Sequence, residues 1–519
     1  MDHLLEYFSS VFTPDNMAKA TSIAENRLRE DMLPCANVQA GKYTTCSNPG
    51  TSACSACKLA CQKEHWRHHK RDCQNSMRSG NWQPIWVREG REPSFIRNES
   101  LEEESVRRTS EGFSIGIALW GNTPAMDVLN LSCNENDPKK DFSLAFIGAF
   151  GDLRHVIRKT QEGEGAIVPL GQNSTMSVCL PQDATEFFLH FISSSASMEK
   201  IQNEYDRVRT APSRKDYRDR MYTGLRPSHR VAFQEFRRFG IVLPFGAINA
   251  HFNVPNLSLF SLEGTWWQTD YADPLEAWDM ATVVKTGKVY GANVEDIYGC
   301  LYFFLSKELR EFAHRFRTMK SSFTMTCFDA RRVPQMIHEG LLSEYNLPPS
   351  IRFDRIEVSN ILDANYVGIN EGKNAAIVGY FMNWISLQQD ARASRAGGAA
   401  MMRILPAAAE KNKVKEKGRV MTHGDIQSLL FNSLDDIEAL YDNSKPFSAF
   451  LRKQGLDSIL KKTNLRLREK HKIVPHRILA PLTARPNALP EFPDDDTWYY
   501  YTKLNCSTWA ERFVEFERA

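Results

Sequence analysis

The chain lacks an excess of charge of either sign. It carries 65 Lys and Arg residues against 63 Asp and Glu residues, which gives a formal net charge of +2 over 519 residues. A dedicated nucleic-acid binder usually shows a strong basic excess, and a disordered acidic chain shows the opposite. The balance argues against both classes, and an apolar content of 42% is ordinary for a folded protein.

Long apolar runs are also missing. The apolar stretch around residues 187–192 is far shorter than the roughly 20 residues that a membrane-spanning helix needs. The opening residues, MDHLLEYFSSVFTPDN, lack the basic start and apolar core of a secretory signal. We therefore expect an intracellular protein, in the cytoplasm or nucleus, with no membrane segment and in surroundings where disulfides are rare.

Cysteine is sparse outside one segment. Of the 11 cysteines, six lie in Cys35–Cys73. The others are scattered through apolar sequence, and we expect them to be small buried core residues. These are Cys133, Cys179, Cys300, Cys327 and Cys506. Grouped cysteines in a reducing compartment usually hold a metal, so the cluster predicts a metal site.

Four residues of this cluster form a complete ligand set for zinc. Cys54 and Cys57 are separated by two residues, so both thiolates can reach one ion from a tight turn. His69 and Cys73 are separated by three residues, which places them on one face of a helix, one turn apart. A tetrahedral set without an open position is typical of structural zinc. A segment of about 40 residues rarely folds without a metal or disulfides, so zinc binding would supply the folding free energy here.

The sequences CSNPGTSACSACKL and ACQKEHWRHHKRDC, with an early Cys35-Ala36-Asn37, resemble the MYND-type zinc finger in its fungal form. That family holds two zinc ions with eight interleaved ligands. The resemblance implies that Cys54, Cys57, His69 and Cys73 bind the second zinc. It also implies that the first zinc keeps three ligands, because a short segment that carries one of the family's ligand cysteines is missing after Cys57. These three ligands are Cys35, Cys46 and Cys61.

The missing segment leaves two arrangements open. In one, water, His65 or His68 completes the first zinc site. In the other, Cys57 and Cys61 bind the first zinc, and the second site is incomplete. Both arrangements give seven ligands for two sites. We therefore expect one firm zinc site and a second, weaker one.

The same resemblance implies a binding function. In the family, a shallow groove beside the last helix accepts proline-containing peptides, and the matching positions here are Gln62 and Trp66. An indole can stack on a proline ring, and a side-chain amide can bond an extended peptide backbone. Two alternatives stay open. Trp66 could pack inside the finger, and the basic residues of 63–71 could contact DNA, although a solvated helix face explains them as well.

After the finger, DFSLAFIGAFGDLRHVIRKT predicts a short strand, a glycine turn and a helix. This order opens doubly wound α/β units. Gly148 and Gly151 would let a ligand approach the backbone at the start of the helix. WGNTPAMDVLNL, just before, predicts a turn followed by a helix.

WGNTPAMDVLNL and GAFGDLRHVIRKT resemble an uncharacterised domain that follows MYND fingers in many fungal proteins and opens a dynein axonemal assembly factor. Its glycine turn has been likened to the cofactor loop of S-adenosylmethionine-dependent methyltransferases. The acidic residue that would then hold the ribose is Asp183, behind Pro181 and Gln182. The resemblance thus implies an alternative function, a methyltransferase of Rossmann type that binds S-adenosylmethionine.

The later sequence carries three further predictions. IRFDRIEVSNI predicts a strand, and AAIVGYFMNWI predicts a second, buried one. Asp354, Arg355 and Asn360 could line a pocket, but a buried ion pair at the strand end is the preferred interpretation. The last residues predict an amphipathic helix whose apolar stripe belongs to the core. The stripe consists of Trp509, Phe513 and Phe516.

The expected fold is a small zinc-stabilised finger followed by a large, mixed, Rossmann-like α/β region with a helical C-terminal part. Its segments are an N-terminal helical segment (1–30), the finger (31–75), a linker (76–114), a Rossmann-like domain (115–300) and a C-terminal α/β region (301–519) with a mobile segment and helix (386–425). The linker is expected because residues 76–114 have few apolar residues and no sustained period.

These observations favour an interaction protein over an enzyme. The finger would dock a proline-containing peptide of a partner protein, and the α/β region would serve as the scaffold. We expect no catalytic residues. The nearest stretch to a SET-domain motif, NAHFNVPN, has no cysteine, so a SET-type methyltransferase is excluded. If the chain is an enzyme, the Rossmann-type methyltransferase is the alternative.

Overall fold

The computed structural model describes residues 74–97, 127–147 except 138, 175–179, 197–245, parts of 247–277, 278–318, 322–326, 328–358, 374–412, 423–505, 507 and 509–519. These residues fall into two compact units, each built from discontinuous segments. The first unit consists of the described parts of Met1–Trp82, Arg226–Asn253 and Thr282–Phe304. The second consists of the described parts of Gln83–Leu225, Val254–Ala281 and Leu305–Ala519.

Helices make up the first unit. They are a 3-10 turn (Ser76–Arg78), α11 (Pro227–Phe239), α12 (Met280–Val289) and the first turns of α13 (Ile297–Thr318). Pro227 starts α11, where its missing N–H costs nothing, and Gly240 ends it in the left-handed region at φ 67°. A Cβ on Gly287 of α12 would collide with the side chain of Cys300, so only glycine allows this approach to α13.

A mixed sheet organises the second unit. Five strands are hydrogen-bonded in the order β1-β4-β5-β7-β6, while β2 and β3 form a separate parallel pair. β1, β4 and β5 are parallel, and β7 is antiparallel to both β5 and β6. The strands are β1 (Leu144–Phe146), β2 (Thr175–Cys179), β3 (Ser322–Thr326), β4 (Arg355–Glu357), β5 (Ala376–Phe381), β6 (Leu465–Leu467) and β7 (Arg512–Arg518). The expected mixed α/β region is therefore confirmed.

Many helices accompany this sheet. They are α4 (Ile85–Arg88), α5 (Ser94–Arg97), α9 (Met198–Thr210), α10 (Lys215–Thr223), α14 (Val333–His338), α15 (Trp384–Leu387), α16 (Gly398–Asn412), α17 (His423–Asp436), α18 (Ser444–Lys453), α19 (Leu456–Thr463) and α20 (Asp495–Tyr499), which a π-helical turn (Tyr500–Leu504) continues. No helix in the described part of the chain has the length and apolar character needed to cross a membrane.

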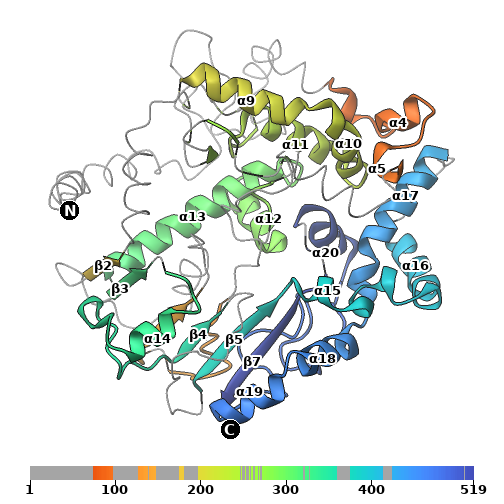
Figure 1. Ribbon diagram of the computed structural model, residues 1–519. Coiled ribbons are helices and arrows are strands. Elements are labelled where there is room, and N and C mark those ends of the chain that lie inside the picture. Colours follow the sequence, from red (N-terminus) through yellow and green to blue (C-terminus); the bar gives the residue numbers. More distant parts are fainter. Residues whose placement is uncertain are drawn as a thin grey trace. The chain divides into compact units, whose positions relative to one another are not determined.

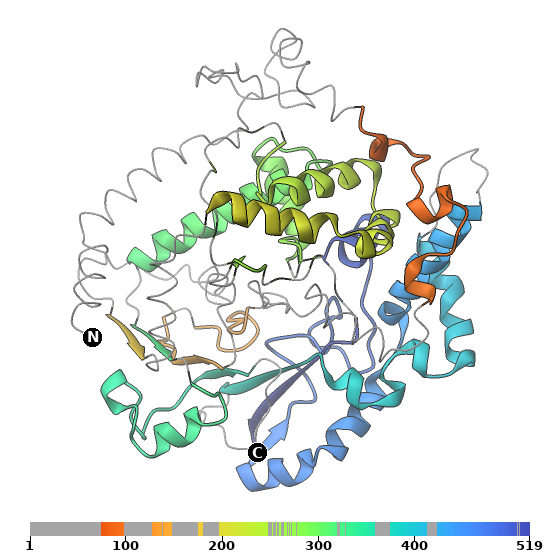
Figure 2. The same ribbon diagram turned by 45° about the horizontal axis from the view of Figure 1, so that its top comes forward.

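The core of the second unit lies on both faces of the sheet. Along β5, Ala376, Val378 and Tyr380 pack into a cluster on one face, while Ile377 packs into a second cluster on the other. The second cluster includes apolar residues of α18 and α19. Both views of the molecule place these two helices along the sheet beside β5 and β7 (Figures 1 and 2).

The end of the chain forms strand β7, so the prediction of a C-terminal helix is wrong. β7 lies between β5 and β6 and is buried on both faces, with Phe513 on one face and Val514 and Phe516 on the other. Apolar residues on both faces hide the period of two that marks a strand. The core assignment itself is confirmed, because Trp509, Phe513 and Phe516 are buried.

The described part of WGNTPAMDVLNL contains no helix, which corrects a second prediction. Residues 131–135 form turns, and Asn130 takes a left-handed conformation at φ 42°. The carbonyl of Val128 accepts a hydrogen bond from Arg355 instead of a helical N–H. Cys133 lies in these turns and is exposed, so the expectation of a buried residue is wrong there. Cys300 is buried as expected. The side chains of the other three scattered cysteines lie outside the described residues.

The segment expected to be a linker is structured where it is described. Trp86 on α4 is fully buried, and its Nε1 donates to Gln427 of α17 at 3.2 Å. Arg91 donates to both carboxylate oxygens of Asp216 on α10, at 2.6 and 2.7 Å. One large indole and one bidentate ion pair thus hold a stretch that has few apolar residues.

The strands of the main sheet come from both of the α/β segments expected from the sequence. β1 belongs to residues 115–300, and its neighbour β4 belongs to 301–519. The helix expected within 386–425 is confirmed as α16, on which Ile404 and Ala408 are buried.

Candidate functional site

The residues predicted to bind zinc, peptide or cofactor all lie outside the described residues. They are Cys35, Cys46, Cys54, Cys57, Cys61, His69 and Cys73 for zinc, Gln62 and Trp66 for peptide, and Gly148, Gly151 and Asp183 for S-adenosylmethionine. Within the described ranges, no three or more His, Cys, Asp or Glu side chains are grouped so as to hold a metal ion. These assignments therefore stay predictions.

The strand end at Asp354 and Arg355 carries a buried charge cluster, as predicted. Arg355 is fully buried and donates from Nη2 to Glu135, whose side chain is 4% exposed, at 2.6 Å. Lys140 lies 2.8 Å from Asp354 and 3.9 Å from Glu135. Two acids and two bases neutralise one another, so the cluster fastens the 127–140 segment to β4. Asn360, the third residue of that prediction, lies outside the described residues.

The guanidinium of Arg355 also satisfies backbone groups. It donates to the carbonyls of Val128, Asp354 and Asn374 at 3.1, 2.8 and 2.6 Å. The donors of this buried cation are thus used in hydrogen bonds and an ion pair within the fold. The residues therefore form a structural ion pair rather than the wall of a ligand site.

Glu515 on β7 forms a second buried cluster. It is fully buried, and Arg468 donates to its Oε2 at 2.8 Å. Its Oε1 also accepts the backbone N–H groups of Ile473 and Val474 at 2.8 and 2.9 Å. A carboxylate with all of these donors is not available as a general base. It fixes the 472–474 segment against the sheet.

Two histidines lie against this segment. The rings of His471 and His476 have centroids 3.6 Å apart. Burial lowers the pKa of both, that of His476 to about 4. The two rings are tilted by 34°, and as neutral imidazoles near pH 7 they pack together without repulsion.

The first unit holds ionisable groups that also serve the fold. His229 bonds the carbonyl of Val294 through Nε2 at 2.8 Å, and burial lowers its pKa to about 4. Asp296 accepts the N–H groups of Phe245 and Gly299, while burial raises its pKa to about 6. Burial raises the pKa of the Cys300 thiol to about 12, so this thiol is no nucleophile near neutral pH.

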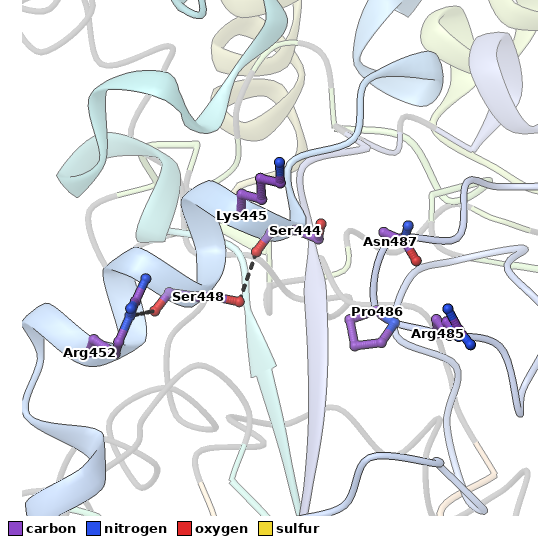
Figure 3. A pocket seen from close by; sticks show the side chains of 7 residues that line it. All are labelled: Ser444, Lys445, Ser448, Arg452, Arg485, Pro486 and Asn487. Atoms are coloured by element: carbon purple, nitrogen blue, oxygen red, sulfur yellow. Dashed lines mark hydrogen bonds between the residues drawn. The ribbon is translucent and has the colours of Figure 1, made fainter.

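A shallow surface pocket lies among the described residues of the second unit. It has a volume of about 420 Å³ and opens widely to solvent. One wall is the exposed side of α18, and the other is the loop of residues 485–487 (Figure 3). Its lining consists of Ser444, Lys445, Ser448, Arg452, Arg485, Pro486 and Asn487. We call this site the basic pocket, because its three charged lining residues are all cations.

A fourth cation lies behind the wall of the basic pocket. Arg512 is 2% exposed, and it donates from Nη1 to the carbonyl of Pro486 at 2.6 Å and from Nε to Asn443 at 2.7 Å. Its Nη2 is buried and has no hydrogen-bond partner among the described residues. Asp442 lies 3.8 Å from this nitrogen. Burial and the nearby charge of Arg477 lower the pKa of Arg512 to about 9.

Sequence reasoning did not find the basic pocket. Lys445 and Arg452 are seven residues apart, so a helix places them on one face, and that signal was present. Arg485 comes from a loop more than thirty residues later, and no local period links it to α18. Arg512 of β7 links the two segments, because it donates both to Asn443, just before α18, and to the carbonyl of Pro486.

Comparison with known proteins gives one result. A family described as "Domain of unknown function (DUF4470)" matches residues 119–178. This part of the chain contains Glu135, β1 and most of β2, and it includes the two sequences on which the resemblance to the uncharacterised domain rests. No curated protein and no solved structure matches the chain.

Proposed function

We propose that the chain is a zinc-dependent interaction protein. The finger at 31–75 holds at least one structural zinc and docks a proline-containing peptide of a partner protein through Gln62 and Trp66. The observation that carries the proposal is the spacing of one complete tetrahedral ligand set. Its members are Cys54, Cys57, His69 and Cys73.

The described core supports a scaffold role for the α/β region. Its most deeply buried charges are bonded to backbone groups or to each other, as at Arg355 and Glu515. Cys300, which is buried, has a thiol whose pKa is raised by that burial. Side chains committed in this way stabilise a fold and are not poised for chemistry.

The described strands do not favour the methyltransferase alternative. In a doubly wound fold, the cofactor lies at the carboxyl ends of adjacent parallel strands. Here β1 pairs with β4, while β2, which precedes Asp183, pairs with β3 in the separate two-stranded sheet. The glycine turn and Asp183 would therefore follow strands of different sheets.

A peptide array tests the docking proposal. The purified full chain is applied to immobilised peptides that each contain one proline, and every binding peptide is repeated with alanine in place of that proline. We expect binding to be lost on this exchange and in the Trp66→Ala variant, because the indole no longer covers the ring. Arg67→Ala, next in sequence, is the matched control and should keep binding.

Zinc content is measured on each variant. If the alanine peptides bind as well as the proline peptides, or if Trp66→Ala retains both its zinc and its binding, the groove assignment is wrong.

A further inference from the structure

We propose that the basic pocket binds a phosphoryl group, the doubly charged end of a phosphomonoester carried by a small molecule or a peptide. This site is separate from the finger and goes beyond the interaction function proposed above.

Charge is the first argument. Lys445, Arg452 and Arg485 are exposed around one small concavity, and the described residues offer none of them an ion-pair partner. Asp442 is the acid nearest to the amino end of α18, where it accepts the N–H of Ser444 at 2.9 Å. The excess of cations over this one acid gives the pocket a positive potential, which attracts an anion.

Arg512 provides the second argument. Its guanidinium is held from two sides, by the Pro486 carbonyl and by Asn443, so it cannot turn toward water. Pro486 itself lines the pocket, which places this buried charge directly behind the wall. Asp442 is 3.8 Å from Nη2, which has no hydrogen bond among the described residues, so the buried charge is only partly compensated. An anion on the other side of that wall offsets part of the remaining cost.

The shape and the donors indicate the class of ligand. Guanidinium and ammonium groups from two walls suit an anion with several oxygens, as a phosphoryl group presents. The Asn487 amide adds a neutral donor at the rim (Figure 3). A pocket of about 420 Å³ that is open on one side fits a single charged group on a larger molecule. The near-neutral charge of the whole chain does not favour a polynucleotide.

Calorimetric titration of the full chain with inorganic phosphate tests the site. We expect binding that weakens as salt is added, and that weakens about tenfold in Arg485→Gln, since each charge-assisted hydrogen bond contributes on that scale. Arg452→Gln should act in the same direction. Both arginines are exposed, so these variants should fold, and circular dichroism checks this. Arg403→Gln, an exposed arginine of α16, is the matched control and should bind as the wild type does.

A phosphoserine peptide and its unphosphorylated form identify the source of the group. Tighter binding of the phosphopeptide than of free phosphate, with no binding of the unphosphorylated form, assigns the pocket to a modified protein. Equal affinity for phosphopeptide and phosphate assigns it to a small phosphorylated molecule. If phosphate gives no heat of binding, or if Arg485→Gln binds as tightly as the wild type, the proposal is wrong.

Discussion

Replacing Arg355 by methionine removes the cation of the buried cluster on β4 and keeps a long, unbranched aliphatic stem. Glu135 then stays buried, with Lys140 as its nearest cation at 3.9 Å. The carbonyls of Val128 and Asn374 also lose a donor. Removing one partner of a buried ion pair typically costs about 3–5 kcal/mol, because the other charge stays uncompensated. We expect Arg355→Met to lower the free energy of unfolding by about 4 kcal/mol.

Urea denaturation followed by tryptophan fluorescence measures this loss. The matched control is Arg352→Met, three residues earlier, where the arginine is exposed and bonds only local carbonyls. That control should stay within about 0.5 kcal/mol of the wild type. Adding Glu135→Leu to Arg355→Met should recover much of the stability, because the unpaired charge is removed. A loss below about 1 kcal/mol in Arg355→Met, or no recovery in the double variant, would refute the reasoning.

Three further predictions concern buried groups and the cofactor. Burial holds the pKa of His229 at about 4 in the fold against about 6.5 when unfolded, so its protonation favours the unfolded chain. This group should leave the free energy of unfolding unchanged above pH 6.5 and lower it by about 3 kcal/mol as the pH drops to 4. In urea denaturation at a series of pH values, His229→Gln should lose this part of the pH dependence. The same pH dependence in the variant and the wild type would contradict the prediction. Glu515→Gln should lower the unfolding free energy by about 2–3 kcal/mol, because the buried ion pair with Arg468 is lost. Glu517 is only partly buried, so Glu517→Gln should cost less than about 1 kcal/mol. Equal costs would contradict the idea that burial makes the Glu515 pair the stronger one. Calorimetry with S-adenosylmethionine should show no heat, and heat that disappears in Gly151→Val would favour the methyltransferase instead.

The local sequence is sufficient to predict a strand where that strand is short and densely apolar. β4 and β5 were predicted because Ile356, Val358 and the run from Ala376 stand close together between polar stretches. The ion pair at Arg355 was predicted because a charge inside such a run must find a partner when buried. The identity of that partner, Glu135, could not be read, because it lies 220 residues away.

The features that the local sequence does not predict depend on contacts between segments that are far apart in the chain. Trp509, Phe513 and Phe516 suit a helix stripe, and only the pairing of Phe513 with Tyr380 across β5 and β7 makes the end of the chain a strand. The basic pocket also depends on a long-range contact, because Arg512 of β7 bonds Asn443 beside α18 and the carbonyl of Pro486 in the loop. Trp86 and Arg91 show a third case, in which a polar segment is held by two side chains whose partners lie far along the sequence.

Zinc content of the purified full chain tests the central claim most directly. Mass spectrometry of metals, after dialysis under reducing conditions, should find at least one zinc per chain, and Cys73→Ser should lose it because three ligands remain in the complete set. A chain that is free of zinc after preparation with ample metal, or one in which Cys54 and Cys57 are found in disulfides, would contradict the account.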